Sequence, residues 1–396
     1  MKLKTVNLFL FLTIVFLFSQ FLKLDLQSVA SLSSEENVDL TFLAIIVFSI
    51  FILCILFIYL NKDLKIRPET SFLRNLMFCI FGISIFHSFN EPFSTKLLNV
   101  TIILPYLIFL FTYISTNVIN RKVLLGIIPV FFLYIVFSYF QEFAKIVASS
   151  LSDEGSQTNA SYFVLYLLPL MLCLNKKWIH YLAFLITIFV TLSSAKRSGT
   201  IAVLLGLIVF VSIELYTQRS YIFKKRGFVY VLFVLLIFII AVVNTGFIQD
   251  LSVFNRMLEL KEDGGSGRTE IYLHTLSMIG NSDILSLLLG HGWDGVLRDS
   301  KLEASAHNDF LEIIYDFGII GIFMYLLFYY FLFKKISLLV KKKSQYAVPF
   351  AVSAIFFAFN SFGSHIIIYP GYMCIFSTCW GYILGQEFKQ RHKIST

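Results

Sequence analysis

His307 has the residue type and the position best suited to acid–base chemistry in this sequence. It lies in the stretch SAHNDFLEIIYDFGIIG, residues 305–321, where a long polar segment gives way to apolar residues. An imidazole with a pKa of about 6.5 can accept a proton from a hydroxyl group while the hydroxyl oxygen attacks an electrophile. The alternative is a histidine that only helps to cap a helix, because Ser305 to Asp309 are of the types that cap helix starts.

Polar side chains continue after His307 at helical spacing. Asn308, Glu312 and Asp316 are four residues apart, so they would share one face of a helix. A carboxylate next to an imidazole can orient it or can act as the base itself. Asp309 and Glu312 are the candidates for either role.

Two groups of basic residues could bind an anion. Lys196 and Arg197 lie in LSSAKRSGT, residues 192–200, a tight turn that opens an apolar run. Arg268 follows a glycine-rich stretch and opens a helix predicted at 268–280. Guanidinium groups and the N–H groups of helix starts bind phosphates. The alternatives are an anchor to lipid headgroups at the first position and a flexible surface loop at the second.

The turn-rich stretch LLLGHGWDGV, residues 287–296, is a third candidate. Trp293 could stack on a sugar ring, although a tryptophan near a membrane more often anchors the chain at the interface. His291 could be catalytic, and a structural histidine in the turn is the alternative. We find no Ser-His-Asp order, HExxH motif or DxD-like motif, and we therefore expect chemistry that is independent of metal ions.

The rest of the chain is strongly apolar. Hydrophobic residues make up 58% of the 396 residues and charged residues 14%, and phenylalanine occurs 45 times. Soluble domains are about 45–50% apolar and about 25% charged. Continuous apolar runs of about 17–22 residues recur, as in membrane-spanning helices and unlike the alternating strands of a barrel. The sequence predicts an all-α polytopic membrane protein of about twelve transmembrane helices with one large, partly helical loop.

We place the spans at residues 6–24, 38–60, 74–90, 97–118, 123–141, 160–175, 178–194, 199–216, 228–247, 309–333, 346–363 and 371–386. The first is interpreted as a retained span and not as a signal peptide, because its apolar part is long and no small-residue cleavage site follows. All five cysteines fall in apolar runs, where they predict small buried side chains.

The distribution of charge predicts the orientation. With both termini in the cytoplasm, most of the 32 basic residues lie inside and most of the 24 acidic residues lie outside, as the positive-inside rule requires. The net charge of +8 is thus a signal of topology and not of nucleic-acid binding. The long polar loop lies outside, and we expect its helix 268–280 to lie along the membrane surface.

The chain divides into four predicted parts. These are residues 1–190 with helices one to seven, 191–247 with the basic turn and helices eight and nine, 248–308 as the large loop, and 309–396 with the last three helices and the tail. In the last part, Gly318 and Gly321 predict close packing between helices.

Together, these motifs resemble a known family. The basic Ser-Gly turn at 196–199, the Arg-Thr-Glu helix start at 268–270, the LGHG turn at 289–292 and the HNDFLE and GIIG motifs of 305–321 carry the resemblance. They are similar to the superfamily of O-antigen polymerases and O-antigen ligases, the Wzy and WaaL type of integral-membrane glycosyltransferases. The resemblance covers residues 190–335, and the first half of the chain matches only in its number of spans.

The resemblance implies an inner-membrane enzyme of GT-C-like architecture with its large loop in the periplasm. Such enzymes transfer a glycan from undecaprenyl diphosphate to an acceptor hydroxyl, and no cofactor or metal is implied. The positions that match the family's catalytic residues are Arg197, Arg268 and His307. We predict substrate contacts from six further residues: Lys196, Glu270, Trp293, Asn308, Asp309 and Glu312.

A polymerase of lipid-linked oligosaccharide repeat units is the preferred function, for O-antigen or a capsule-like polysaccharide. The Phe- and Ile-rich first half, which lacks recognisable motifs, suits a protein adapted to one glycan. The alternative is a ligase that moves glycan onto lipid A-core, because both branches share the Arg, Arg, His order. A flippase or transporter is the second alternative, although it would place ionisable residues inside the spans. Expected partners are the lipid-linked glycans, inner-membrane lipids, and a chain-length regulator and flippase of the same pathway.

Overall fold

The computed structural model describes residues 3–31, 40–62, 70–88, 100–149, 159–194, 196–217, 268–302, 304–364, 366–367 and 369–394. All regular elements within these ranges are helices, which confirms the predicted all-α class. The predicted span 228–247 and the loop up to residue 267 lie outside the described residues.

The helices follow one another along the chain with these bounds. They are α1 (Leu3–Ser31), α2 (Leu40–Leu60), α3 (Ser71–His87), η3 (Val100–Ile103), α5 (Leu104–Val118), α6 (Arg121–Ser149), α7 (Ser161–Met171), α8 (Lys177–Ser193), α9 (Arg197–Thr217), α13 (Arg268–Gly280), α14 (Ile284–Leu289), α15 (Gly295–Asp299), α16 (Asp309–Lys341), α17 (Ala347–Gly363) and α18 (Pro370–Ile394).

Six helices in the described part of the chain are long and apolar enough to cross a membrane, namely α1, α2, α5, α6, α9 and α16. The helices α3, α7, α8 and α17 are apolar but shorter. This agrees with a multi-pass membrane protein, while the number of twelve spans stays a prediction. α1 and α6 each have 29 residues and extend past the predicted spans 6–24 and 123–141. Hydropathy marks only the apolar part of a helix, and these two helices continue into their polar flanks.

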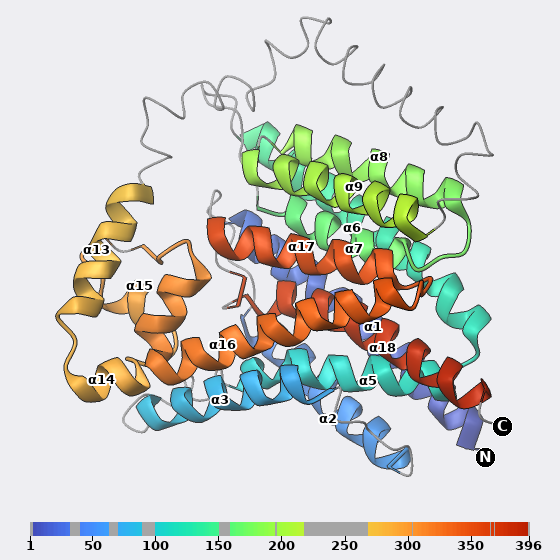
Figure 1. Cartoon of the computed structure of the whole chain (residues 1–396), viewed down its shortest axis with the longest axis horizontal. Coiled ribbons are helices and arrows are strands. Elements are labelled where there is room, and N and C mark those ends of the chain that lie inside the picture. Colours follow the sequence, from blue (N-terminus) through green and yellow to red (C-terminus); the bar gives the residue numbers. More distant parts are fainter. Residues whose placement is uncertain are drawn as a thin grey trace, which may run out of the picture.

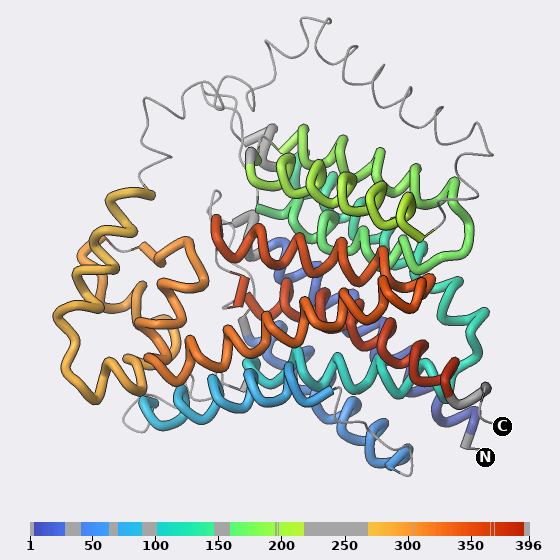
Figure 2. Tube along the Cα trace, in the orientation of Figure 1, coloured from blue at the N-terminus to red at the C-terminus, as the bar shows by residue number. Residues whose placement is uncertain are grey.

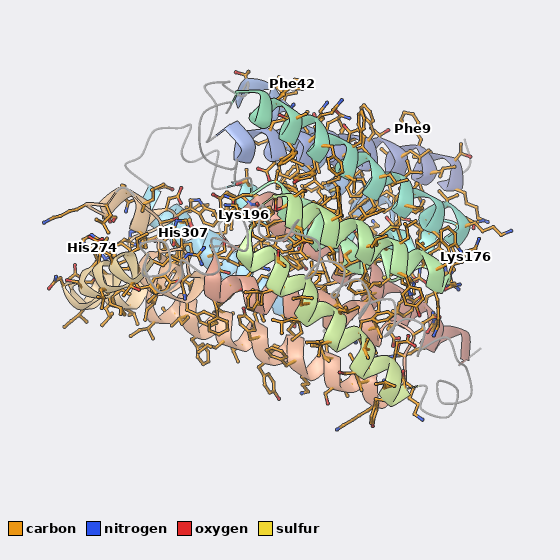
Figure 3. All side chains as sticks on the ribbon, turned by 90° about the horizontal axis from the view of Figure 1, so that it is seen from above. Phe9, Phe42, Lys176, Lys196, His274 and His307 are labelled. Carbon is orange, nitrogen blue, oxygen red and sulfur yellow. The ribbon has the colours of Figure 1, made fainter. Side chains whose placement is uncertain are left out.

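Large apolar side chains cover the outer surface of the helix bundle. Phe9 on α1 is 66% exposed and Phe42 on α2 is 51% exposed, and both lie at the periphery of the molecule (Figure 3). Exposed patches of this kind are rare on soluble monomers and are typical of surfaces that contact lipid.

α18 lies inside the bundle, where it packs against α5, α7 and α17 (Figure 1). Nearly all of its side chains from residue 371 to residue 387 are buried. Gly381 and Gly385 form a GxxxG pair that lets α18 approach α5 closely. A Cβ atom added to Gly381 would lie 2.5 Å from the carbonyl oxygen of Phe109 on α5.

The two ends of the bundle differ. The loop helices α13, α14 and α15 lie at one end, and the start of α1 and the end of α18 lie together at the other (Figures 1 and 2). Lys196 lies at the same end as His307, whereas Lys176 lies at the far end of α8 (Figure 3). The arrangement agrees with two termini on one side of the membrane and the loop on the other. Which side is cytoplasmic stays a prediction.

Candidate active site

His307 lies in a strained backbone position just before α16. Its φ angle of 49° is in the left-handed region, which few residues other than glycine adopt, although histidine is among those enriched there. The hydroxyl group of Tyr272 on α13 donates a hydrogen bond of 3.3 Å to the His307 carbonyl oxygen. Such positions cost about 1–3 kcal/mol and often mark functional sites.

Two positive charges lie near the His307 imidazole. Burial is the largest cause that lowers the pKa of His307, and the charges of Arg268 and Lys196 lower it further. Arg268 opens α13 and also approaches α17, since a Cβ atom added to Gly363 would lie 3.6 Å from its Nη1 atom. The structure thus brings together residues from the α8–α9 turn, the start of α13 and the start of α16. Because the pKa of His307 is lowered, the neutral imidazole that can accept a proton predominates near pH 7.

Arg197 is the first residue of α9, and its side chain lies outside the described residues. The next residue, Ser198, is hydrogen-bonded through its hydroxyl group to Tyr162 on α7. Tyr162 also lies within electrostatic range of Arg268. Tyr162 was not predicted from the sequence, because tyrosine is common at the ends of apolar runs, where it lies at the membrane interface.

Asn308 and Asp309 connect the start of α16 to the chain between α17 and α18. The Asn308 Oδ1 atom accepts bonds from the N–H groups of Phe310 and Leu311, and caps α16. Its Nδ2 group donates to the carbonyl oxygen of Phe362 at 3.1 Å.

The Asp309 carboxylate accepts three bonds: from Ile366 N at 2.7 Å, from Ile367 N at 3.2 Å and from the Tyr325 hydroxyl at 2.8 Å. Asp309 is fully buried in this structure, and its contact with substrate stays a prediction.

Glu312 also binds the backbone next to His307. Its Oε2 atom accepts a bond of 2.7 Å from the N–H group of Ala306, the residue before His307. One turn later, Asp316 accepts a bond of 3.0 Å from Val296 N on α15. Both carboxylates are fully buried, and they hold the loop against α16.

Glu270 and Trp293 are the two remaining predicted substrate contacts, and the structure gives each a different environment. Glu270 is exposed, and a rotation of about 200° separates it from Arg268 around α13. It lines an open hollow with Thr269, Leu273, His274 and Leu302. Trp293 is half-buried, and its ring centroid lies 6.0 Å from that of Phe317 on α16. The predicted contacts of Glu270 and Trp293 with substrate stay predictions.

His291 lies within a structural network. Its ring stacks on Tyr315 with centroids 4.2 Å apart, and its Nε2 atom lies 3.0 Å from the Ser282 hydroxyl. Asp299 lies 4.0 Å from the Nδ1 atom and accepts a bond from the Tyr315 hydroxyl. These contacts agree with a structural histidine in a turn, the alternative to a catalytic role.

Among the described residues, no group of three or more His, Cys, Asp or Glu side chains could hold a metal ion. The described part of the site holds the His307 imidazole beside the positive charges of Arg268 and Lys196, at one end of a bundle of apolar helices. This arrangement fits a membrane enzyme that handles an anionic substrate.

Residues 182–326 match the family model described as O-antigen ligase. The match confirms the resemblance to the superfamily of O-antigen polymerases and ligases, and it includes all nine predicted site residues. It supports a membrane enzyme of the glycosyltransferase type, with a function of the ligase or polymerase kind. No curated protein matches the chain.

Proposed function

We propose that this protein is a polymerase of oligosaccharide repeat units carried on undecaprenyl diphosphate. It would act in the bacterial inner membrane, with α13, α14 and α15 on the periplasmic side. The observation that carries the proposal is that Arg268, at the start of α13, and Lys196 lie near the His307 imidazole. Lys196 and His307 lie at the same end of the bundle (Figure 3), and α13 lies at the end opposite the termini (Figure 1). An imidazole and an anion site are the two groups that this transfer needs.

The proposed reaction exchanges one C–O bond for another. The hydroxyl oxygen of an acceptor sugar attacks the anomeric carbon of the donor glycan, and its proton passes to the neutral His307 imidazole. The bond between that carbon and the diphosphate breaks, and the lipid diphosphate leaves with the electron pair. Arg268, Lys196 and Arg197 stabilise the negative charge that grows on this leaving group. A general base of this kind contributes about 10²–10⁴-fold to the rate.

The second candidate is an O-antigen ligase, which the printed description of the matching family favours. It would use the same residues, and only the acceptor would differ: the lipid A-core in place of another repeat unit. Deletion of the gene separates the two candidates. Loss of long chains, with single repeat units still attached to the core, supports a polymerase. Loss of all attached glycan, with polymer left on the carrier lipid, supports a ligase.

The residues are tested by complementing the deletion strain with His307→Ala, Arg268→Ala or Arg197→Ala. We expect each variant to be inserted in the membrane and to fail in chain extension. His274→Ala is the matched control, because His274 lies on the same loop and lines the hollow on the other face of α13. Full activity of all three site variants would overturn the proposed mechanism. A chain-length regulator and a flippase of the same pathway are the partners that we propose.

A further inference from the structure

α16 is broken at Gly318. This residue has φ of 63° and ψ of −163°, a combination that is essentially restricted to glycine. In a continuous helix, each carbonyl oxygen accepts a bond from the N–H group four residues later. Near the break, the carbonyl oxygens of Tyr315 and Asp316 instead accept bonds from the loop, from His291 N at 3.0 Å and Gly292 N at 2.8 Å. The LGHG turn therefore supplies hydrogen-bond donors to the broken helix.

The two backbones approach so closely that no side chain fits between them. A Cβ atom on Gly290 would lie 2.2 Å from the carbonyl oxygen of Asp316, and one on Gly318 would lie 2.4 Å from that of Leu288. Gly292 faces α3, where an added Cβ atom would lie 2.7 Å from the Cβ atom of His87. All three glycines also have positive φ angles. We name Gly290, Gly292 and Gly318 the glycine joint.

The glycine joint divides the loop into two parts that carry different site residues. One part runs from residue 291 to residue 317 and carries His307. It begins and ends at the joint, because the His291 N–H group donates a bond to the Tyr315 carbonyl oxygen. In the other part, α14 and α13 lead away to Arg268. The two parts meet again at the Tyr272 bond to His307, described above.

A small second core also lies between the two parts of the loop. It consists of buried Val296, Ala306 and Tyr315, with Met278, Ile279 and Leu311 packed against it. The side chains of this core can adapt to small shifts, whereas the joint consists of direct contacts between backbones. The joint therefore fixes the orientation of α14 relative to α16.

We propose that the glycine joint is the positioning element that sets the spacing of Arg268 and His307. The inference rests on the proposed function for the roles of these two residues. The glycines themselves are positioning residues, and they touch neither the donor nor the acceptor. Contacts between backbones have no rotamers to exchange, so the joint fixes the loop on α16 with little freedom. A displacement of about 1 Å at a catalytic group can cost about 100-fold in rate.

The first test compares Gly290→Ala with Gly280→Ala. Gly280 is in the same loop, and an added Cβ atom there would meet nothing within 4 Å. We expect Gly290→Ala to be inserted in the membrane and to lose about 10- to 100-fold in kcat with little change in KM. The acid limb of its pH–rate profile should also move to higher pH, because Arg268 no longer lowers the pKa of His307 as strongly. Gly280→Ala should match the wild type in both. A Gly290→Ala variant with wild-type kcat and profile overturns the inference.

The second test does not depend on activity. Leu273 and Leu302 are 64% and 39% exposed and line one hollow, so cysteines there can carry a pair of spin labels. The five native cysteines are buried or half-buried and should react slowly. We expect a narrow distribution of distances in the wild-type and Gly280→Ala backgrounds, and a broadened or displaced one in Gly290→Ala.

The outcomes separate the joint from the proposed function. An unchanged distribution in Gly290→Ala overturns the joint. If the distribution broadens in Gly290→Ala but the wild-type protein transfers no glycan, the joint is supported and the proposed function is overturned. If Gly290→Ala does not accumulate, Gly292→Ala is measured in its place. Its φ of 91° is strained for alanine, and its added Cβ atom would lie 2.7 Å from the Cβ atom of His87, so we expect the same change in the distance distribution.

Discussion

Substitution of Asp309 separates a structural role of its carboxylate from a role in binding substrate. The carboxylate is fully buried and accepts bonds from Ile366 N, Ile367 N and the Tyr325 hydroxyl. In Asp309→Ala, the buried N–H groups of Ile366 and Ile367 lose their acceptor. In Asp309→Asn, the amide oxygen can still accept from both N–H groups, and only the acceptor for Tyr325 is lost.

The expected losses in stability follow from these contacts. A buried donor without a partner costs about 1–3 kcal/mol, so two such N–H groups predict about 2–6 kcal/mol for Asp309→Ala. The Tyr325 hydroxyl lies 3.0 Å from the Ser361 Oγ atom and can donate there in place of Asp309. We therefore expect only about 1–2 kcal/mol for Asp309→Asn.

The assay combines thermal unfolding of the detergent-purified protein with glycan transfer by its folded fraction. The unfolding temperature should fall in the order wild type, Asp309→Asn, Asp309→Ala. Asp309→Asn should keep its rate within about tenfold of the wild type, because the backbone contacts at the start of α16 persist. An Asp309→Asn variant as stable as the wild type but without transfer activity would refute this reasoning and would assign the carboxylate to the chemistry.

Three further predictions concern charge, packing and the membrane. The pKa of His307 is lowered by burial and by Arg268 and Lys196, and the rate should fall as pH decreases through this pKa. Arg268→Gln removes one positive charge, so the acid limb of whatever activity remains should move to higher pH, and a limb that stays in place contradicts the base role. Gly385→Val should abolish folding, because its Cβ atom would lie 2.6 Å from the Tyr113 carbonyl oxygen and its two methyl groups must also fit between α18 and α5. Gly126→Val has open space around it and should fold, and size-exclusion chromatography measures both. A polarity-sensitive dye on Ile284→Cys, 88% exposed on α14, should report an apolar environment in liposomes, whereas the same dye on exposed Lys301→Cys should report water.

The sequence predicted those features that depend on local pattern. The helix from Arg268 to Gly280 has the predicted bounds, and α16 begins at the predicted residue 309. Both follow from local signals, namely glycines or cap residues followed by helix-forming residues. The apolar helices were predictable in the same way, since the bilayer requires long continuous apolar runs.

Features that depend on contacts between distant residues could not be read from the pattern. Gly318 and Gly321 were expected to serve helix packing, but Gly318 breaks α16 and receives the LGHG turn. In the sequence, a glycine that breaks an apolar helix cannot be distinguished from one that allows close helix packing. Tyr162 comes 36 residues before its partner Ser198, and only the fold brings them together. For the same reason, the sequence could not show that Asp309 accepts bonds from the N–H groups of Ile366 and Ile367, far along the chain.

The role of His307 as the base is tested by glycan transfer by the purified protein in liposomes that contain undecaprenyl-diphosphate-linked repeat units. The measured quantity is the initial rate of lipid diphosphate release that accompanies formation of longer chains. We expect His307→Ala to lose at least about 100-fold in this rate, while His274→Ala retains it. Transfer by His307→Ala at the wild-type rate would show that the His307 imidazole is not the base.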